Sequence, residues 1–311
     1  MLGPRTRTGI LFGAIFGLFV VVGALLGQYL FGSYFGGLVV ALGLSLVLNL
    51  VSYFFCDRFV LWANRGTIVT ESEAPRLGRI VRELAPRFGL VDPRLALIPT
   101  QTPNAFATGR DERHAVVAVT EGLLRLLDDR ELTGVLAHEM AHVKDHDILL
   151  MTFAATLAGA ISYAAQMVFY SAIFGGNNRN GSNVIVVMVA AITAPIAAML
   201  IQLAISRSRE SRADEVGART IADPGSLADA LQKLEYWNTR RPMPFGSPAS
   251  SSLFIVNPFR GSSFASLFST HPPIEERIQR LRAMRADYRY RPAVTSPRSP
   301  PLGGRVAGVP R

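Results

Sequence analysis

The chain has 311 residues, of which 49% are hydrophobic and only 18% carry a charged side chain. About 25% is usual for a soluble protein, so the composition argues against an ordinary soluble domain and favours membrane-spanning segments. The single cysteine, Cys56, excludes an intrachain disulfide and a cysteine-based metal site. The net charge of +9 could indicate a nucleic-acid partner, but the chain has no zinc-finger, RNP or basic-zipper pattern. We therefore expect no nucleic acid and attribute the basic excess to a polar part on the cytoplasmic side of a membrane.

Four apolar segments divide the chain. Residues 9–31 and 34–55 each exceed the about 20 residues that a helix needs to cross a bilayer. A signal peptide is the alternative for the first, but its apolar core is too long for one. Residues 148–174 and 184–205 are richer in Ala and Gly, and form either two further spans, which we favour, or a helical hairpin partly buried in protein. We therefore expect a mainly α membrane protein with four transmembrane helices.

Basic residues set the expected orientation of these spans. Arg5 and Arg7 precede the first span, and several arginines follow the second and the fourth. The short loops on the other side carry only Arg179. Because basic residues remain on the cytoplasmic side, the N-terminus, the polar regions and the C-terminus should all be cytoplasmic. We expect a multi-pass protein of the cell's inner (cytoplasmic) membrane, with the lipid bilayer as a partner.

The polar regions have alternating helix and strand patterns. We expect helices over residues 70–87, 226–237 and 273–284, and strands of a small antiparallel sheet over residues 94–99, 104–108 and 115–120. Residues 240–269 are rich in Ser, Pro, Phe and Gly and should form a long loop.

Residues His138 to His142 read His-Glu-Met-Ala-His within a stretch of helical character. Histidines four apart lie on one face of a helix, so two imidazoles can bind one metal ion. Glu139 lies beside them and can take a proton from water as a general base. The pattern favours peptide-bond hydrolysis. The alternative is a helix with two unrelated surface histidines and a salt-bridging Glu139, which is rare by chance in a chain with five histidines.

A catalytic metal site of this kind needs a third protein ligand. The best candidate is Glu210, in the segment Arg209–Asp214 that continues the fourth apolar segment. Asp214 lies one helical turn further, so one carboxylate can bind the metal while the other holds a histidine N–H. A solvated charged helix face is an equally weighted alternative. His146 is the reserve ligand if Glu210 does not bind.

These two motifs, together with Pro103–Gly109 and Thr270–Pro273, resemble the HtpX family of membrane zinc peptidases, which is akin to the CAAX prenyl proteases. The resemblance extends over residues 9–284, and implies a zincin-like α+β catalytic domain. In that family an aromatic residue usually follows the glutamate of the second motif, whereas this chain has Ser211. We expect this change to affect local packing and not metal ligation.

The resemblance implies the metal and its ligands. One Zn²⁺ per chain would be held by His138, His142 and Glu210, and Asp214 would be the partner carboxylate. The run downstream of the first motif, residues 144–147, fits the polar end that the family's zinc helix has, although His146 stands where other polar residues are common in the family.

The resemblance also implies further roles near the metal. Asn104 and Ala105 correspond to an edge-strand segment that binds substrate through main-chain hydrogen bonds; otherwise they belong to an ordinary strand. His271 corresponds to a histidine thought to stabilise the oxyanion; otherwise it starts a helix before two prolines. Arg277 either braces the site or pairs with Glu276 or Asp214.

The expected organisation has five regions. These are a transmembrane hairpin (1–56), the first part of the catalytic domain (57–147), a second transmembrane hairpin (148–205), the second part of the catalytic domain (206–290) and a disordered tail (291–311).

We expect an integral-membrane zinc endopeptidase with a cytoplasmic active site. Its substrates would be membrane proteins or unfolded proteins, and the resemblance implies membrane protein quality control. The alternatives are a catalytically silent, zinc-containing membrane scaffold and a processing protease for lipidated peptides, for which four spans are too few to build the large chamber required. The sequence does not indicate an oligomeric state.

Overall fold

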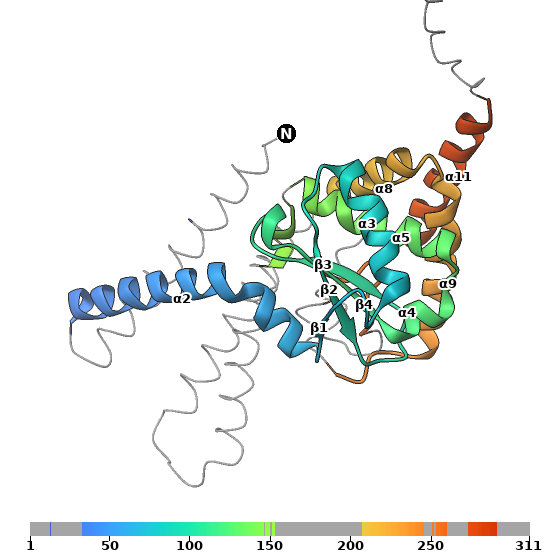
Figure 1. Cartoon of the computed structure of the whole chain (residues 1–311). Coiled ribbons are helices and arrows are strands. Elements are labelled where there is room, and N and C mark those ends of the chain that lie inside the picture. Colours follow the sequence, from blue (N-terminus) through green and yellow to red (C-terminus); the bar gives the residue numbers. More distant parts are fainter. Residues whose placement is uncertain are drawn as a thin grey trace, which may run out of the picture.

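The computed structural model describes residues 13, 33–145, 147–149, 151–152, 207–245, 251, 253–259 and 273–290. A sheet covered by helices forms the body, and one long helix, α2 (Tyr34–Ala63), extends away from it (Figure 1). The other three expected spans lie almost wholly outside the described residues. Within those residues, no helix has both the length and the apolar character needed to cross a membrane. The expected spans and the five-region organisation stay predictions.

The sheet has four strands, in the order β1-β2-β4-β3. Their bounds are Thr67–Val69 for β1, Arg94–Ile98 for β2, Ala105–Thr108 for β3 and Val116–Thr120 for β4. The β1–β2 and β3–β4 pairs are antiparallel, but β2 and β4 are parallel. The prediction of an antiparallel sheet was therefore wrong in one pairing, and the sheet is mixed.

The parallel pair follows from two chain reversals between β2 and β4. After the first reversal β3 runs back along the outer edge, and after the second β4 enters the gap between β3 and β2. The second reversal begins at Gly109, whose φ of +140° suits glycine, and a Cβ there would lie 2.6 Å from the His114 carbonyl oxygen. This topology leaves β3 at the edge of the sheet.

Both faces of the sheet are buried, which explains why β4 reads as an unbroken apolar run. Alternate residues such as Val117 and Val119 pack against helices α3 and α5, and the intervening residues, such as Ala118, pack against the end of α2 and Phe254. The catalytic motif therefore lies on a helix that packs directly against the sheet.

Helix α3 (Pro75–Phe88) confirms the expected amphipathic helix, although it begins at Pro75 rather than Thr70. Proline suits the first turn, where its missing N–H has no helical partner. Gly89 ends the helix in the left-handed conformation, with φ +71°. Three short elements were not predicted from the sequence: β1, the 3₁₀ turn η1 (Glu112–His114) and α4 (Glu121–Leu126). They are too short for a periodic pattern to indicate them.

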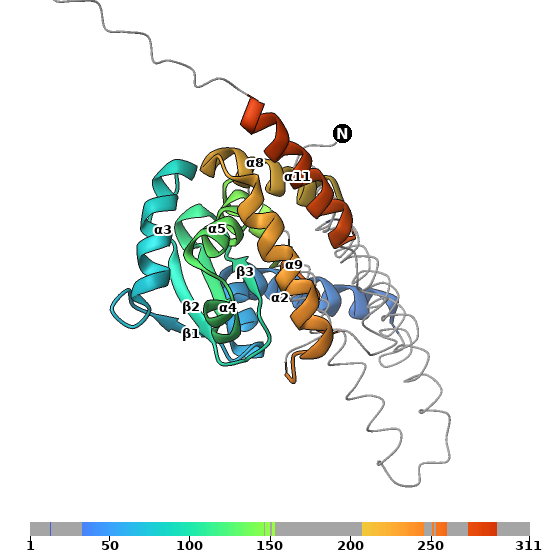
Figure 2. The same ribbon diagram turned by 90° about the vertical axis from the view of Figure 1, so that its right-hand side faces the viewer.

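Helix α5 (Asp129–Lys144) contains the histidine motif and begins with a capping box between Asp128 and Glu131. Helices α8 (Arg207–Ile221) and α9 (Pro224–Arg240) pack against it, and α11 (Ile274–Tyr290) packs against both of these helices. Helices α9 and α11 confirm expected helices. Helices α9 and α11 lie side by side (Figure 2).

Helix α8 approaches α5 closely at Gly217. A Cβ on this residue would lie 3.0 Å from the backbone nitrogen of His138. The glycine therefore lets the two helix backbones come together, and it brings the acidic side chains of α8 against the histidine face of α5.

Candidate active site

Helix α5 presents His138 and His142 on one face, as their spacing predicted. Both side chains are buried, and their ring centroids are 4.8 Å apart. The four-residue spacing alone places the rings one turn apart, and the packing of α8 and the sheet around α5 excludes solvent from them.

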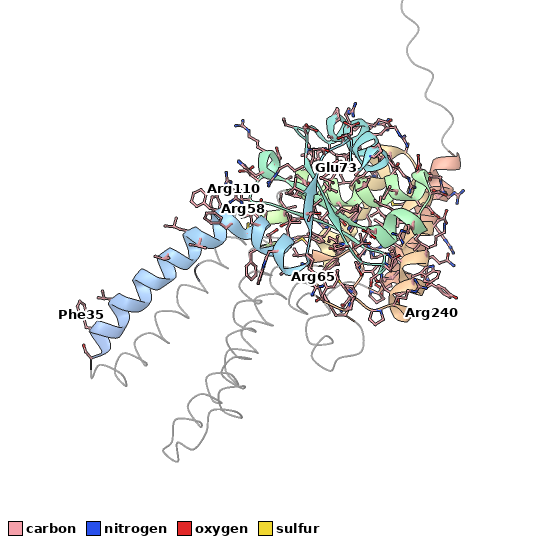
Figure 3. All side chains as sticks on the ribbon, turned by 60° about the horizontal axis from the view of Figure 1, so that its bottom comes forward. Phe35, Arg58, Arg65, Glu73, Arg110 and Arg240 are labelled. Carbon is pink, nitrogen blue, oxygen red and sulfur yellow. The ribbon has the colours of Figure 1, made fainter. Side chains whose placement is uncertain are left out.

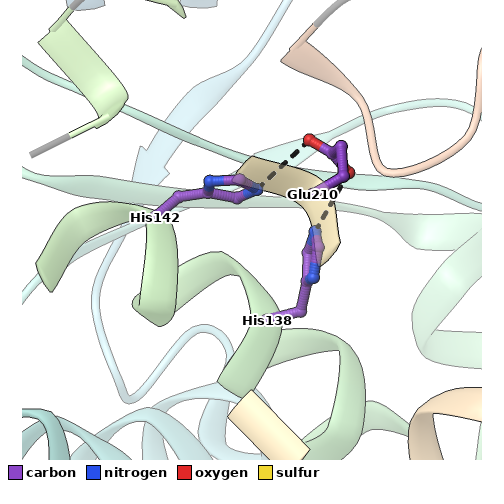
Figure 4. Close-up of side chains that lie close together, drawn as sticks. All are labelled: His138, His142 and Glu210. Atoms are coloured by element: carbon purple, nitrogen blue, oxygen red, sulfur yellow. Dashed lines mark ion pairs between the residues drawn. The ribbon is translucent and has the colours of Figure 1, made fainter. Parts of the chain in front are cut away.

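Glu210 on α8 lies opposite both rings (Figure 4). Its two carboxylate oxygens lie 3.7 Å from Nε2 of His138 and 3.5 Å from Nε2 of His142. One potential ligand atom from each residue lies within 4.8 Å of the others. Ligand–metal distances of about 2.0–2.2 Å fit such a spacing. The expected three residues are therefore together, and the solvated charged face considered as the alternative for Glu210 is excluded, because its side chain is buried.

The charge around these histidines also fits a divalent cation. Four carboxylates are buried here, those of Glu139, Asp147, Glu210 and Asp214, together with two guanidinium groups, those of Arg209 and Arg277. When all four carboxylates are ionised, the carboxylates outnumber the guanidinium groups among these residues by two negative charges. Buried charges need compensation, and a dication between the histidines would supply it.

Glu139 is held by the edge strand of the sheet. Its Oε2 accepts a hydrogen bond of 2.9 Å from the backbone N–H of Ala107 on β3. Its Oε1 is buried and has no hydrogen-bond partner among the described residues. Burial raises the pKa of the Glu139 carboxyl to about 7, which suits a group that takes and returns a proton near neutral pH.

Asp214 contacts the far side of His138. Its Oδ1 lies 3.0 Å from Nδ1 of that ring, so the carboxylate can hold the Nδ1–H and leave Nε2 free toward Glu210. Arg277 of α11 donates two hydrogen bonds to Asp214, at 2.9 and 2.7 Å, and is itself fully buried. Of the two pairing partners expected for Arg277, Glu276 and Asp214, the structure shows Asp214.

The ion pair with Arg277 determines whether Asp214 is ionised. Burial alone would raise the pKa of Asp214, but the Arg277 guanidinium and His138 outweigh it and lower the pKa to about 2. The carboxylate is therefore ionised at any physiological pH, and it can accept the histidine N–H throughout.

Asn104 and Ala105, the expected substrate segment, are both buried where β3 begins. The Asn104 side-chain amide donates to the carbonyl oxygen of Val256 at 2.6 Å, and the N–H of Ile255 donates to the carbonyl oxygen of Ala105 at 3.1 Å. The outer edge of β3 is thus bonded here to residues 253–259 of the same chain. Substrate binding by these two residues stays a prediction, and a peptide that pairs with Ala105 would have to displace Ile255.

The remaining histidines contribute nothing to this cluster within the described residues. His114 pairs with Asp111 at 2.6 Å and with Arg110 at 2.7 Å, near the turn that leads into β4. These contacts give His114 a structural role at this turn. His146 and His271 lie outside the described residues, and their expected roles stay predictions.

Two polar residues near the site had no role in the sequence analysis. Asp147 lies 3.5 Å from Nδ1 of His142, and Arg209 lies 3.4 Å from Asp147. The available signal was weak: Asp147 follows His142 at the polar end of the helix, and Arg209 precedes Glu210 directly.

Comparison with known proteins extends these observations. The model for Peptidase family M48 matches residues 71–285. A protease HtpX homolog of Pyrococcus furiosus is 50% identical over 90% of this chain and 96% of its own length, and one of Syntrophobacter fumaroxidans is 51% identical over 91% of this chain and 100% of its own. A crystal structure of S. mikatae Ste24p aligns with a TM-score of 0.47 at 20% identity, over 89% of this chain and 64% of that one.

We predict that metal binding releases about one proton near neutral pH, because protons and metal compete for the same imidazole. Burial alone would lower the pKa of His142, but Asp147 and Glu210 raise it to about 10, whereas burial lowers the pKa of His138. The metal-free site therefore has a proton on His142 that a metal must displace. Because this proton is bound with a pKa of about 10, apparent affinity should rise with pH up to about pH 10 and level off above it.

Titration calorimetry with zinc in buffers of different ionisation enthalpy measures this proton count. Glu139→Gln is the control, since it removes the Glu139 carboxyl, whose pKa is about 7, and leaves His142 in place. A heat that does not depend on the buffer in either protein would contradict the protonation scheme.

Proposed function

The chain belongs to peptidase family M48 and is an HtpX-type metallopeptidase, and on this premise we propose that it is a zinc-dependent endopeptidase of a cellular membrane. The resemblance drawn from the motifs is thereby confirmed at the level of the family. The observation that carries the proposal is the buried His138–His142–Glu210 cluster with Glu139 beside it.

Zinc is the metal that this donor set favours. Two imidazole nitrogens and one carboxylate are typical of catalytic zinc sites, which keep one further position open. Zn²⁺ held by His138, His142 and Glu210 would polarise the scissile carbonyl group and make a water molecule more acidic.

Glu139 performs the proton transfers. One of its oxygens is fixed by Ala107, so the other is kept in a constant position for a water proton. The carboxylate takes that proton as the water attacks the carbonyl carbon, and it returns a proton to the amine that leaves. Because Ala107 lies on the edge strand, the same strand that would align a peptide also positions the base.

Features of α2 support attachment to a membrane. Apolar side chains along it are exposed to a third or more: Phe35, Val39, Val47, Leu50, Val51, Phe54, Phe55, Phe59 and Trp62. Figure 3 shows Phe35 at the far end of α2, and Arg58, Arg65 and Arg110 where α2 meets the body. Exposed apolar surface that ends at arginines is typical of a segment that enters a bilayer and stops at its headgroups.

The polar body would then lie on the cytoplasmic side, close to the membrane surface. Membrane proteins and unfolded proteins are the substrates that this location makes accessible, and quality control of membrane proteins is the corresponding cellular role. Recognition through main-chain hydrogen bonds at a strand edge would accept many sequences, as such a role requires.

We predict that Glu139→Gln abolishes proteolysis while zinc stays bound. Loss of a general base costs about 10²- to 10⁴-fold in rate, and Glu139 is not among the three grouped ligands. The assay is zinc-dependent cleavage of casein by detergent-purified, full-length protein, with zinc content measured on the same samples.

Glu215→Gln is the matched control for this assay. Glu215 lies on α8 but is exposed, and among the described residues it pairs only with Arg219 one turn away, so this variant should cleave casein at the wild-type rate. Equal proteolysis by wild type and Glu139→Gln would instead support a catalytically silent, zinc-containing scaffold.

The proposed topology predicts a labelling pattern in intact cells. In a Cys56→Ser background, a cysteine at Thr239, an exposed residue of α9, should react with a membrane-impermeant maleimide only after the cells are permeabilised. A cysteine at Asn178, in the loop expected on the other side, should react at once. The reverse pattern, or recovery of the protein outside the membrane fraction, would refute the topology.

A further inference from the structure

We propose that Asp147 is a positioning residue that orients His142, as Asp214 orients His138, so that the metal site depends on two histidine–carboxylate pairs. This inference rests on the proposed metallopeptidase function, and it concerns a residue that belongs to neither motif. Asp147 lies five positions after His142, beyond the end of α5.

The geometry around His142 carries the inference. Its Nε2 faces Glu210 at 3.5 Å, and its Nδ1 faces Asp147 Oδ2, also at 3.5 Å. Nδ1 is buried and makes no hydrogen bond within the described part of the chain. A small rotation of either side chain would close the 3.5 Å separation to a hydrogen bond. The Nδ1–H would then point at Asp147 and leave the Nε2 lone pair toward Glu210.

The same arrangement surrounds both histidines. His138 has Asp214 at Nδ1, and Asp214 has Arg277; His142 has Asp147 at Nδ1, and Asp147 has Arg209 with its Nε at 3.4 Å. All four of these charged partners are buried. Each histidine thus has a carboxylate beside its Nδ1, and each of these carboxylates has an arginine as its ion-pair partner.

A purely structural link to α8 does not explain why Asp147 is buried beside Arg209, because Asp145, two residues earlier, already pairs with α8. Asp145 pairs with Arg212 of α8 at 2.6 Å, and the Arg212 side chain is 67% exposed. An exposed pair joins helix ends with little desolvation, whereas a buried pair is costly. The buried Asp147–Arg209 pair lies beside His142 and can orient it, whereas the Asp145–Arg212 pair cannot.

The test compares Asp147→Ala with Asp145→Ala in full-length protein in detergent. Each substitution removes one carboxylate that pairs with an arginine of α8, but only Asp147 faces a histidine. Zinc affinity is measured by competition with a chelator. Removal of such a partner typically costs 10- to 100-fold in metal affinity, so we expect a loss of about that size in Asp147→Ala and less than about twofold in Asp145→Ala.

Asp147→Asn separates orientation from charge pairing. The amide oxygen can still accept the Nδ1–H, but it cannot neutralise Arg209. We expect this variant to bind zinc at least about threefold more tightly than Asp147→Ala, and more weakly than wild type. Cobalt(II) bound in place of zinc should show an absorption spectrum that changes in Asp147→Ala and not in Asp145→Ala, since that spectrum depends on ligand geometry.

Thermal unfolding of the metal-free proteins accompanies these measurements. If Asp147→Ala does not fold, the zinc affinity of Asp147→Asn is compared with that of Asp145→Asn instead. Equal affinities of these two variants would overturn the inference. Equal losses in Asp147→Ala and Asp147→Asn would also overturn it, because they would show that only the ion pair with Arg209 matters. Wild type that binds no zinc would overturn the proposed function as well, whereas tight binding by wild type and Asp147→Ala alike would overturn this inference alone.

Discussion

The charge buried between α5 and α8 is the constraint on which the rest of the site depends. In the part of the chain that the structure describes, four buried carboxylates lie around the two histidines, together with two buried guanidinium groups. Such an excess of buried negative charge is unfavourable unless protons or a cation compensate it. In the metal-free protein, burial raises the pKa of Glu139, with Glu210 adding to the effect, and the carboxylates of Asp147 and Glu210 raise the pKa of His142. A bound dication would replace protons as the compensating charge, which couples metal binding to the protonation of the site.

The fold joins this charge cluster to the edge of the sheet. Ala107 on β3 holds the base, and Ala105 two residues earlier is bonded to Ile255. Arg277, which holds Asp214, also donates to the carbonyl oxygen of Ile255 at 3.1 Å. Residues 253–259 therefore connect the arginine of the metal site to the strand on which a peptide substrate would lie. A substitution in this segment would therefore affect both the edge of β3 and the arginine that holds Asp214.

The parts of the site that sequence could predict are those that depend on local geometry. Helical spacing was enough to bring His138 and His142 together, and to place Glu210 and Asp214 on one face of α8. The order of strands and the partners of Arg277 and Asp147 depend instead on contacts between residues far apart in the chain. No local pattern predicts that β4 lies beside β2, or that Arg209 pairs with Asp147. The family resemblance supplied roles for Asn104, Ala105 and His271, and the first two lie at an edge already bonded to the same chain.

The most direct test of the account is an anomalous-difference map at the zinc absorption edge, from crystals of the full-length protein grown with zinc. The account predicts one strong peak in the described part of the chain, about 2.0–2.2 Å from Nε2 of His138, Nε2 of His142 and a carboxylate oxygen of Glu210. Asp147 and Asp214 should contact the far nitrogens of the two rings and not the metal. A peak ligated by either aspartate, or no peak between the two histidines, would contradict the assignment of the site.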